Sequence, residues 1–352
     1  MKLFANRHIL PEKKEYISLL YPFWGMIPEI QGSSDQGRFD DYAAQGRNIF
    51  TIVESLADAD AVVLPFEWRS RKQWGENYER NLQAASDLAA EASRFGKKLI
   101  IFFNNDSEEP VPVENSIVFR TSFSRSCRQA NEFAMPGWSV DFLVRYLGGE
   151  LIVRPKQSIP VVGYCGYVDY DFSLPQSLLM YGLRRLGGRK IKAGAALRGR
   201  AVRGLRKEKR LKLDYIYRAD FKGGCGERER VEYVQNMTGC DYALVTRGVG
   251  NFSYRLYEVM SCGRIPVFVD TDCVLPFDHL IDWKKYCIWV DAAEIEALGE
   301  KIVAFHERIT PDEFEGLQQS IRKLYEEWLS PTGFYRSIWR CFSACAEVKA
   351  WS

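Results

Sequence analysis

Four side chains between residues 247 and 258 have the chemistry to hold a phosphorylated ligand, and they are Arg247, Ser253, Arg255 and Glu258. Guanidinium groups and a hydroxyl donate hydrogen bonds to phosphate oxygens, and a carboxylate accepts them from the hydroxyls of a ribose. Gly248 and Gly250 follow the first of these side chains, and glycine lets backbone N–H groups approach a ligand closely. The residue types and their spacing therefore indicate a site for a nucleoside diphosphate.

The same stretch also has a purely structural interpretation. Arg255 and Glu258 stand at i and i+3, which on a helix permits a surface ion pair that contributes only about 0.2–0.5 kcal/mol. The apolar positions of the expected helix form one stripe, which consists of Phe252, Leu256, Val259 and Met260. This stripe is expected to pack on a sheet, which leaves the polar flank either to a ligand or to solvent.

Strands on both sides would fix this helix in place. An apolar run at 241–246 ends directly before Arg247, and a second at 264–270 follows Gly263, where the helix is expected to stop. The helix is expected to begin near Asn251, so its free N–H groups would lie at the carboxyl end of the first strand. Open parallel sheets bind ligands at that edge.

The rest of the chain alternates strand-like and helix-like segments, which predicts βαβ units and parallel sheets. The expected strands are 16–22, 61–66, 98–103, 116–121, 159–167, 241–246, 264–270 and 285–291. The expected helices are 39–59, 78–96, 228–239, 251–263, 312–329 and 334–348. We expect two Rossmann-like α/β domains in tandem, at 1–156 and 157–325, followed by a helical segment at 326–352.

The composition of the chain narrows its class. It has 352 residues, 46% hydrophobic and 27% charged, with a formal net charge of +2, as is typical of a globular protein without a charge-selected partner. Nine scattered cysteines and only three histidines predict no metal site and a reducing compartment. We see no signal peptide or membrane span, and expect a cytoplasmic protein, with peripheral contact at the inner face of a membrane as an option.

Charge is uneven in one region, because residues 184–212 contain 13 Lys or Arg and one acid, Glu208. A solvated helix and loop is the simpler interpretation. The alternative is a surface for an anionic partner, such as a charged glycan, a lipid phosphate or nucleic acid. Nucleic acid is disfavoured, because no aromatic side chain lies in the stretch to stack on bases.

The stretch from Asp241 to Asp291 resembles the exostosin family of glycosyltransferases. That family carries a pattern close to R-G-x-G-x-x-S-x-R-L-x-E-A-x-x-x-G-x-I-P-V, followed by L-P-F-x-x-x-I-D-W. The matching residues are Arg247, Gly248, Gly250, Ser253, Arg255, Leu256, Glu258, Gly263, Ile265, Pro266, Val267, Leu275, Pro276, Phe277, Ile281, Asp282 and Trp283. The chain departs from the pattern at Val259, where Ala is usual, and at Arg264, where Cys is common.

The resemblance implies an inverting glycosyltransferase of the GT-B fold, with two Rossmann-like domains whose open parallel sheets face each other across a cleft. The donor would be a nucleotide diphosphate sugar, with UDP expected, and no metal or other cofactor is expected. The acceptor, a glycan or lipid-linked oligosaccharide, would contact the first domain, onto which 326–352 would pack. The donor contacts would be Arg247, Gly248, Gly250, Ser253, Arg255, Glu258, Gly163 and Gly166.

Inversion requires a base that takes the proton of the acceptor hydroxyl. Two carboxylates follow strands of the first domain, Glu67 and Asp106, and we favour Asp106, although a turn or helix cap is the simpler role for each. The weaker candidates are Asp35, Asp40 and Asp41. Two tryptophans near Glu67, Trp68 and Trp74, could stack on acceptor sugars, although packing is the simpler role.

Some alternatives stay open. A GDP-fucose transferase of related architecture would place a similar serine and glutamate on a helix before a Pro-Val strand. A non-catalytic protein that senses a nucleotide sugar, or one that binds nucleic acid through 184–212, is the alternative outside the enzymes. Asp270 and Asp272 are spaced like a metal motif, but their place after a strand favours a turn or a contact to the donor sugar.

Overall fold

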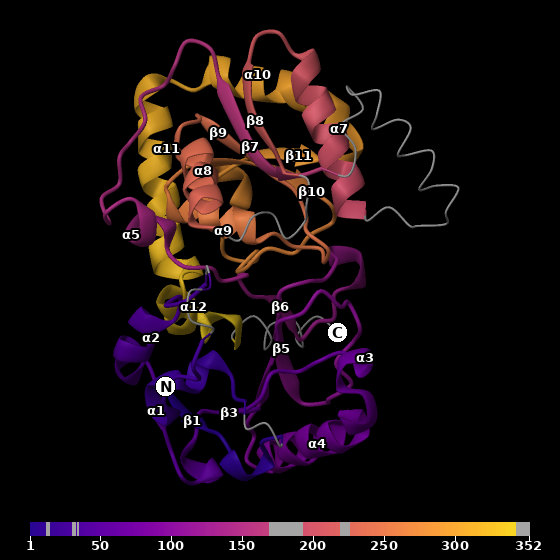
Figure 1. Ribbon diagram of the computed structural model, residues 1–352. Helices are drawn as coiled ribbons and strands as arrows, with labels where there is room; N and C mark the ends of the chain where they lie inside the picture. Colours follow the sequence, from indigo (N-terminus) through magenta and orange to yellow (C-terminus); the bar gives the residue numbers. More distant parts are fainter. Residues whose placement is uncertain (12–14, 30–32, 34, 169–192, 219–225, 343–352) are drawn as a thin grey trace. The chain divides into compact units, whose positions relative to one another are not determined.

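The computed structural model describes residues 1–11, 15–29, 33, 35–168, 193–218 and 226–342. Its contacts divide the chain into two units, which are described separately below (Figure 1). Unit 1 comprises 1–140, 272–281 and 326–352, and unit 2 comprises 141–271 and 282–325. The first border between the units lies at 140/141, whereas it was expected at 156/157 from the sequence. Residues 272–281, which were expected in the second domain, belong to unit 1.

The described strands of unit 1 form a six-stranded sheet in the order β2-β1-β3-β4-β5-β6, in which every recorded pairing is parallel. The strands are β1 (Lys2–Phe4), β2 (Thr51–Ile52), β3 (Ala61–Val63), β4 (Leu99–Phe103), β5 (Ser116–Arg120) and β6 (Glu132–Ala134). The helices are α1 (Tyr21–Trp24), α2 (Asp40–Gln45), α3 (Arg71–Trp74), α4 (Tyr78–Arg94) and α12 (Pro331–Ser337).

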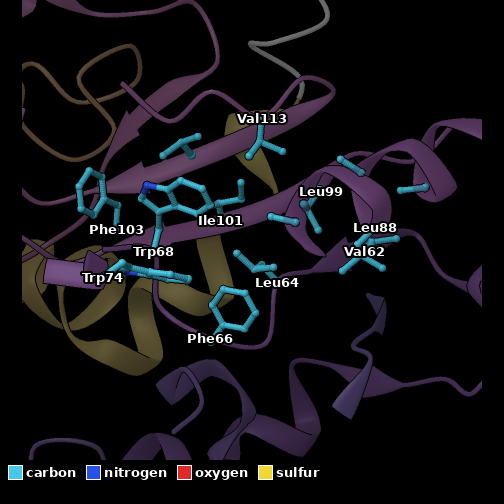
Figure 2. Packing of buried hydrophobic residues seen from close by; sticks show 14 of the residues in the cluster. Val62, Leu64, Phe66, Trp68, Trp74, Leu88, Leu99, Ile101, Phe103 and Val113 are labelled. Atoms are coloured by element: carbon cyan, nitrogen blue, oxygen red, sulfur yellow. The ribbon is translucent and has the colours of Figure 1, made fainter. Parts of the chain in front are cut away.

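One hydrophobic cluster holds α4 against β3 and β4. The amphipathic helix places Ala85, Leu88 and Ala89 on the sheet, where they meet Val62 and Leu99 (Figure 2). The cluster extends to Trp68 in the loop after β3 and to Trp74 at the end of α3. Burial of this apolar surface is the main source of stability for such a layer.

The described strands of unit 2 form a five-stranded sheet in the order β11-β10-β9-β7-β8, again with every recorded pairing parallel. The strands are β7 (Val161–Tyr167), β8 (Lys212–Arg218), β9 (Tyr242–Val245), β10 (Ile265–Asp270) and β11 (Ile288–Asp291). The helices are α5 (Phe142–Tyr146), α7 (Ala193–Lys207), α8 (Glu227–Thr238), α9 (Tyr254–Ser261), α10 (Leu298–Arg308) and α11 (Pro311–Leu324). The predicted α/β class with two open parallel sheets is confirmed.

The helices of unit 2 fall into two packing groups. Helix α7 packs with α10, whereas α8 and α9 both contact α5, and α9 also contacts α11. Figure 1 shows α8 and α9 as neighbours, and α7 beside the opposite edge of the unit. The consequence for the site is that side chains of α8 and α9 can meet.

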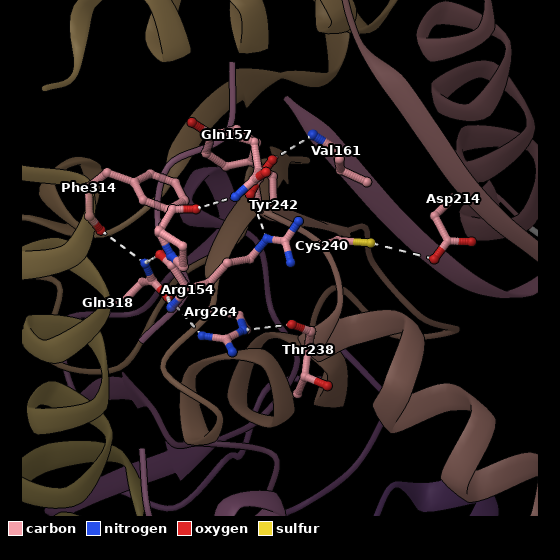
Figure 3. Close-up of polar contacts among 12 residues, drawn as sticks. Arg154, Gln157, Val161, Asp214, Thr238, Cys240, Tyr242, Arg264, Phe314 and Gln318 are labelled. Atoms are coloured by element: carbon pink, nitrogen blue, oxygen red, sulfur yellow. Dashed lines mark hydrogen bonds and ion pairs between the residues drawn. The ribbon is translucent and has the colours of Figure 1, made fainter. Parts of the chain in front are cut away.

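A polar network ties the loop before β7 to β9 and α11 (Figure 3). The carboxylate of Asp241 accepts hydrogen bonds from Nε of Arg154 at 2.7 Å and from the backbone N–H of Val161 at 2.8 Å. The side-chain oxygen of Gln318 accepts from Nη1 of Arg264 at 2.7 Å. These bonds satisfy buried charged and polar groups that would otherwise cost stability.

Several expected elements differ from the structure. The expected strand at 16–22 is wrong, since the chain forms a 3-10 turn at Ser18–Leu20 and then α1. The expected helix at 39–59 reduces to α2 and a 3-10 turn, and is followed by β2. The expected helix at 334–348 is recorded as α12, and residues 343–352 lie outside the described part. Among the described residues, no helix has the length and apolar character needed to cross a membrane.

Candidate functional site

The strand order of unit 2 places a topological switch point between β7 and β9. Strand β8 pairs on one side of β7 and β9 on the other, so the connections after β7 and β9 leave in opposite directions. Crevices at the carboxyl ends of such strand pairs are where open parallel sheets bind ligands. The stretch that begins with Arg247 follows β9 at this edge. The first part of the other connection, 169–192, lies outside the described residues.

The loop after β9 is stabilised by its own backbone and by Asn251. The N–H of Gly248 donates to the carbonyl of Phe252 at 2.7 Å. Asn251 is fully buried, accepts from the hydroxyl of Thr271 at 2.6 Å and donates to its carbonyl at 3.1 Å. Nε of Arg247 is buried with no hydrogen-bond partner among the described residues, while Nη2 reaches the carbonyl of Val249 at 3.3 Å. Arg247 is thus anchored to the loop through Nη2, while its Nε has no acceptor among the described residues.

Helix α9 begins at Tyr254, later than the expected Asn251. Ser253 is its N-cap residue with extended backbone, and its side chain makes no capping hydrogen bond. Leu256, Val259 and Met260 are buried as predicted, but Phe252 precedes the helix and packs edge-on against Tyr254. The predicted stripe is therefore confirmed only for the residues inside the helix.

Arg255 points at the end of β7. Its Nη2 donates a short hydrogen bond to the carbonyl of Cys165. The guanidinium carbon lies 4.4 Å from the ring centre of Tyr164 and 4.9 Å from that of Tyr233. Arg255 therefore links α9 to β7 and stacks on two tyrosines, instead of forming a simple pair with Glu258.

Glu258 is buried, with 8% of its surface exposed. Its Oε2 accepts a 2.5 Å hydrogen bond from the hydroxyl of Tyr233, and its Oε1 lies 3.9 Å from Nη1 of Arg230. Both partners come from α8. A surface ion pair between Arg255 and Glu258, the alternative left by the sequence, does not describe this arrangement.

The two glycines of β7 have different neighbours. A Cβ on Gly163 would lie 2.7 Å from Sγ of Cys240 and 2.9 Å from the carbonyl of Asn236, so this glycine permits α8 to pack closely on the strand. A Cβ on Gly166 would lie 3.0 Å from Nη2 of Arg255. Only Gly166 belongs to the surroundings of Arg255 and Glu258.

Helix α7 carries residues 193–207 of the basic stretch, and its start packs on the loop after β9. A Cβ on Gly194 would lie 2.3 Å from the carbonyl of Gly248, and Nη1 of Arg198 donates to the carbonyl of Arg247 at 3.5 Å. Other basic residues form ion pairs, since Arg200 binds Glu296 and Arg210 binds Glu208. Part of the basic stretch thus supports the loop, and residues 184–192 lie outside the described part.

Part of unit 2 is similar to proteins of the exostosin family. The family model "Exostosin GT47 domain" matches residues 188–304. The matched residues include the loop after β9, helix α9 and the partners of Glu258 on α8. This part of the chain is similar to the exostosin GT47 domain. Exostosin-1 of Drosophila melanogaster is 31% identical over 102 residues, and the Exostosin-1 homolog of Caenorhabditis elegans is 28% identical over 103 residues. These matches cover 29% of this chain and 13% and 26% of the relatives, so the chain spans a small part of the length of its curated relatives.

Solved structures were compared as well. A glycosyltransferase from Rickettsia africae ESF-5 aligns over 98% of both chains at 10% identity with a TM-score of 0.37. TarM aligns over 75% of this chain and 58% of its own at 11% identity with a TM-score of 0.33.

Asp270 ends β10, and Asp272 stands in the bend that follows it. Asp272 has a φ of 64°, and its Oδ2 accepts from the hydroxyl of Ser126 at 2.6 Å and from the N–H of that serine at 3.0 Å. These hydrogen bonds lower the pKa of Asp272. Across the described ranges, no group of three or more histidine, cysteine, aspartate or glutamate side chains could hold a metal ion.

The Leu-Pro-Phe motif serves packing in unit 1. Leu275 and Phe277 are buried, and the ring of Phe277 lies 5.2 Å from that of Trp328 and 5.5 Å from that of Phe334. Asp278 accepts from Nη1 of Arg128 at 2.8 Å. This motif therefore contributes buried contacts to unit 1.

The two candidate bases differ in their surroundings. Glu67 follows β3, at the switch point between β1 and β3 of the six-stranded sheet, and burial raises the pKa of its carboxyl while Arg69 and Arg38 lower it. Asp106 follows β4 on an exposed loop, where its backbone carbonyl accepts from the hydroxyl of Ser122 at 3.3 Å.

The weaker acidic candidates mainly serve local structure. Asp41 accepts from the hydroxyl of Thr332 at 2.5 Å and from the side chain of Gln45 at 2.6 Å. Asp35 lies 3.9 Å from Nη1 of Arg38, and Asp40 begins α2.

The two tryptophans near Glu67 lie in the core of unit 1. Trp68 and Trp74 are 3% and 8% exposed and stand 5.6 Å apart between Phe66 and Phe103 (Figure 2). The expectation that they could stack on acceptor sugars is wrong, because no sugar face can reach buried rings.

Sequence reasoning missed the tyrosines around Arg255. Tyr233 and Tyr164 come from α8 and β7, and nothing in their local sequence reveals that their rings enclose a guanidinium group. Tyr233 stands on a helix of mixed charge, at 227–238, whose buried face a periodicity argument could have found. Periodicity could not have revealed that the hydroxyl of Tyr233 donates to Glu258, 25 residues away.

Proposed function

We propose that the chain is a glycosyltransferase that takes its sugar from a nucleotide diphosphate sugar, with UDP as the nucleotide. The observation that carries this proposal is the buried carboxylate of Glu258 beside the loop after β9, inside the stretch that matches the GT47 domain. A carboxylate at this edge of the sheet, next to a loop with spare donors, suits a ribose and a diphosphate.

In this proposal, the loop and the start of α9 hold the diphosphate. Arg247 retains a buried Nε, and the hydroxyl of Ser253 is not used as a helix cap. Donors fixed in this way stabilise the negative charge that develops on the leaving diphosphate. Arg255 contributes indirectly, because its guanidinium is engaged with Cys165 and two tyrosines.

For the base we propose Glu67 in place of Asp106. A general base works best when its pKa lies near the working pH, and burial raises the pKa of Glu67. As the acceptor oxygen bonds to the anomeric carbon, the bond to the diphosphate breaks and Glu67 takes the hydroxyl proton. This displacement inverts the anomeric carbon and needs no metal ion.

The acceptor is proposed to be a glycan or a lipid-linked oligosaccharide. This part of the proposal follows from the similarity of residues 188–304 to the exostosin GT47 domain. Contact of 184–212 with a membrane surface stays a prediction.

A donor hydrolysis screen tests the proposal. Purified protein is incubated with a panel of UDP- and GDP-sugars, and release of nucleoside diphosphate is measured, with Arg247→Ala as the control variant. We expect release from a UDP-sugar, lowered by roughly tenfold or more in the variant. Release only from a GDP-sugar would favour the fucose-type alternative, and no release from any donor would contradict the proposed activity.

A further inference from the structure

Three residues at and after the end of β10, Asp270, Thr271 and Asp272, have different surroundings. Asp270 is buried and ends the strand, and Asp272 accepts from the hydroxyl and the N–H of Ser126. Thr271, which stands between the two acids, forms two hydrogen bonds with Asn251 in the loop after β9. The threonine therefore connects this acidic segment with the loop of the proposed donor site.

The hydrogen bonds between Thr271 and Asn251 run in both directions. The hydroxyl of Thr271 donates to Oδ1 of Asn251 at 2.6 Å, and Nδ2 of Asn251 donates to the carbonyl of Thr271 at 3.1 Å. Asn251 is fully buried, so a rotation of its amide would break bonds that water cannot replace. The two bonds therefore hold the side chain of Asn251 in one orientation.

The backbone around Asn251 forms a closed turn. The N–H of Gly248 donates to the carbonyl of Phe252 at 2.7 Å, which joins the two ends of the turn. Arg247 stands directly before the turn, and Ser253 stands directly after it as the N-cap residue of α9. The turn therefore determines how far apart these two side chains lie and the direction in which each leaves the backbone.

Strand β10 gives this turn a second support. Strands β9 and β10 are neighbours in the sheet, and Val245 pairs with Phe268 near their carboxyl ends. The turn follows β9 and Thr271 follows β10, so both lie at the same edge of the sheet. Through Asn251, Thr271 fixes the turn to a strand other than the one from which the turn leaves.

We propose that Thr271 and Asn251 are positioning residues that hold Arg247 and Ser253 ready for a diphosphate. This inference rests on the proposed function, in which Arg247 and Ser253 bind that group. Side chains held in place before the ligand arrives lose less freedom on binding, which increases the affinity. Because Arg247 and Ser253 stand at opposite ends of the turn, a ligand with two phosphate groups gains from their fixed spacing, whereas a ligand with one phosphate gains little.

The test compares UDP with UMP by isothermal calorimetry on the full chain. The variant is Thr271→Val, which keeps the branched shape of the side chain but removes the hydroxyl that donates to Asn251. Thr271→Ser, which retains a hydroxyl, should restore the behaviour of the wild type. The matched control is Thr238→Val, since the hydroxyl of Thr238 donates to the carbonyl of Val234 at 2.9 Å, at the end of α8 and not in the loop.

For the wild type, Thr271→Ser and Thr238→Val we expect UDP to bind on the order of tenfold tighter than UMP, as for hydrogen bonds to a charged group. For Thr271→Val this ratio should fall to within about threefold, with the affinity for UMP nearly unchanged. Should Thr271→Val not fold, Thr271→Ala carries the same comparison, because it also lacks the hydroxyl.

A wild-type ratio in Thr271→Val, including one in which both affinities fall by the same factor, would overturn this inference alone, since a purely structural role leaves the ratio unchanged. A ratio that falls equally in Thr238→Val would do the same. A wild type that binds neither nucleotide, or binds both equally, would instead overturn the proposed donor site, and this inference with it.

Discussion

The hydroxyl of Tyr233 on α8 donates a 2.5 Å hydrogen bond to Oε2 of Glu258 on α9. The two residues stand 25 positions apart, on helices that contact the same neighbour, α5. This bond holds the carboxylate of Glu258 in one orientation, unlike that of an acid that only faces solvent. The orientation of Glu258 therefore depends on α8, which lies outside the stretch 247–267.

The glycines of β7 provide a matched pair of variants. Gly163→Ala places a methyl group against Sγ of Cys240 and a backbone carbonyl, and should destabilise the fold by about 1–3 kcal/mol with UDP affinity unchanged. Gly166→Ala meets the end of the flexible Arg255 side chain, and should weaken UDP binding roughly threefold or more with a smaller loss of stability. Urea denaturation measures the loss of stability, and calorimetry measures the affinity for UDP. Weaker UDP binding in Gly163→Ala together with unchanged binding in Gly166→Ala would contradict these roles.

Glu67→Gln should lower turnover by about 10²–10⁴-fold, the usual contribution of a general base. Burial raises the pKa of Glu67, so the stability contributed by its neutral form is complete below the unfolded pKa and is lost as pH rises through the folded pKa. At pH 8 the variant should therefore have a higher Tm than the wild type. Asp106→Asn serves as the control with near wild-type turnover, and a large loss there with an active Glu67→Gln would restore Asp106 as the base.

The buried ion pair of unit 1 should show strong coupling. Nη1 of Arg120 lies 2.5 Å from Oε1 of Glu132, and Arg120 also donates to the carbonyl of Ser107 at 2.8 Å. Arg120→Met alone leaves a buried carboxylate without its partner and should cost about 3–5 kcal/mol. The double variant with Glu132→Met should cost less than the sum of the two single variants. Additive losses of free energy of unfolding in urea would contradict this account.

The buried imidazole of His306 should make the fold less stable in mild acid. Its Nδ1 lies 2.9 Å from the hydroxyl of Tyr242 and its Nε2 lies 2.7 Å from the carbonyl of Gln157, and burial lowers the pKa of the imidazole. The unfolded chain then binds the proton at higher pH than the folded one, so stability is complete above the unfolded pKa and falls as pH drops through the folded pKa.

The measurement is the urea midpoint between pH 7.5 and pH 5. At pH 7.5 the free energy of unfolding of His306→Asn should be about 1–3 kcal/mol lower than that of the wild type, because buried hydrogen bonds are lost. The urea midpoint of the variant should change less with pH. An equal pH dependence in both proteins would assign the acid sensitivity to other groups.

Local patterns predicted the elements whose residues repeat regularly. Helix α4 was expected at 78–96 and spans Tyr78–Arg94, because its apolar residues recur at helical spacing and Gly96 adopts a positive φ of 66° after it. Strands β4 and β10 were found for a similar reason, since each is a continuous buried run. The short strands β1, β2 and β6 were missed, because two or three residues carry no periodicity.

Contacts between distant residues could not be predicted in that way. The run at 16–22 is as apolar as a strand, but Pro22 lies in the first turn of α1 and directs a helix instead. We prefer Glu67 to Asp106 as the base because Glu67 is buried. The sequence shows that each acid follows a strand, but it does not show which of them is buried. The roles of Trp68 and Trp74 were misjudged for the same reason, since their rings are enclosed by strands far along the chain.

We propose that the loop and helix after β9 bind a nucleoside diphosphate through Glu258, and calorimetric titration of UDP measures this binding. Glu258→Gln keeps an acceptor for Tyr233 and so should preserve the Tm, while weakening UDP binding about tenfold or more. Equal affinity of the wild type and Glu258→Gln for UDP, with both proteins folded, would contradict the account.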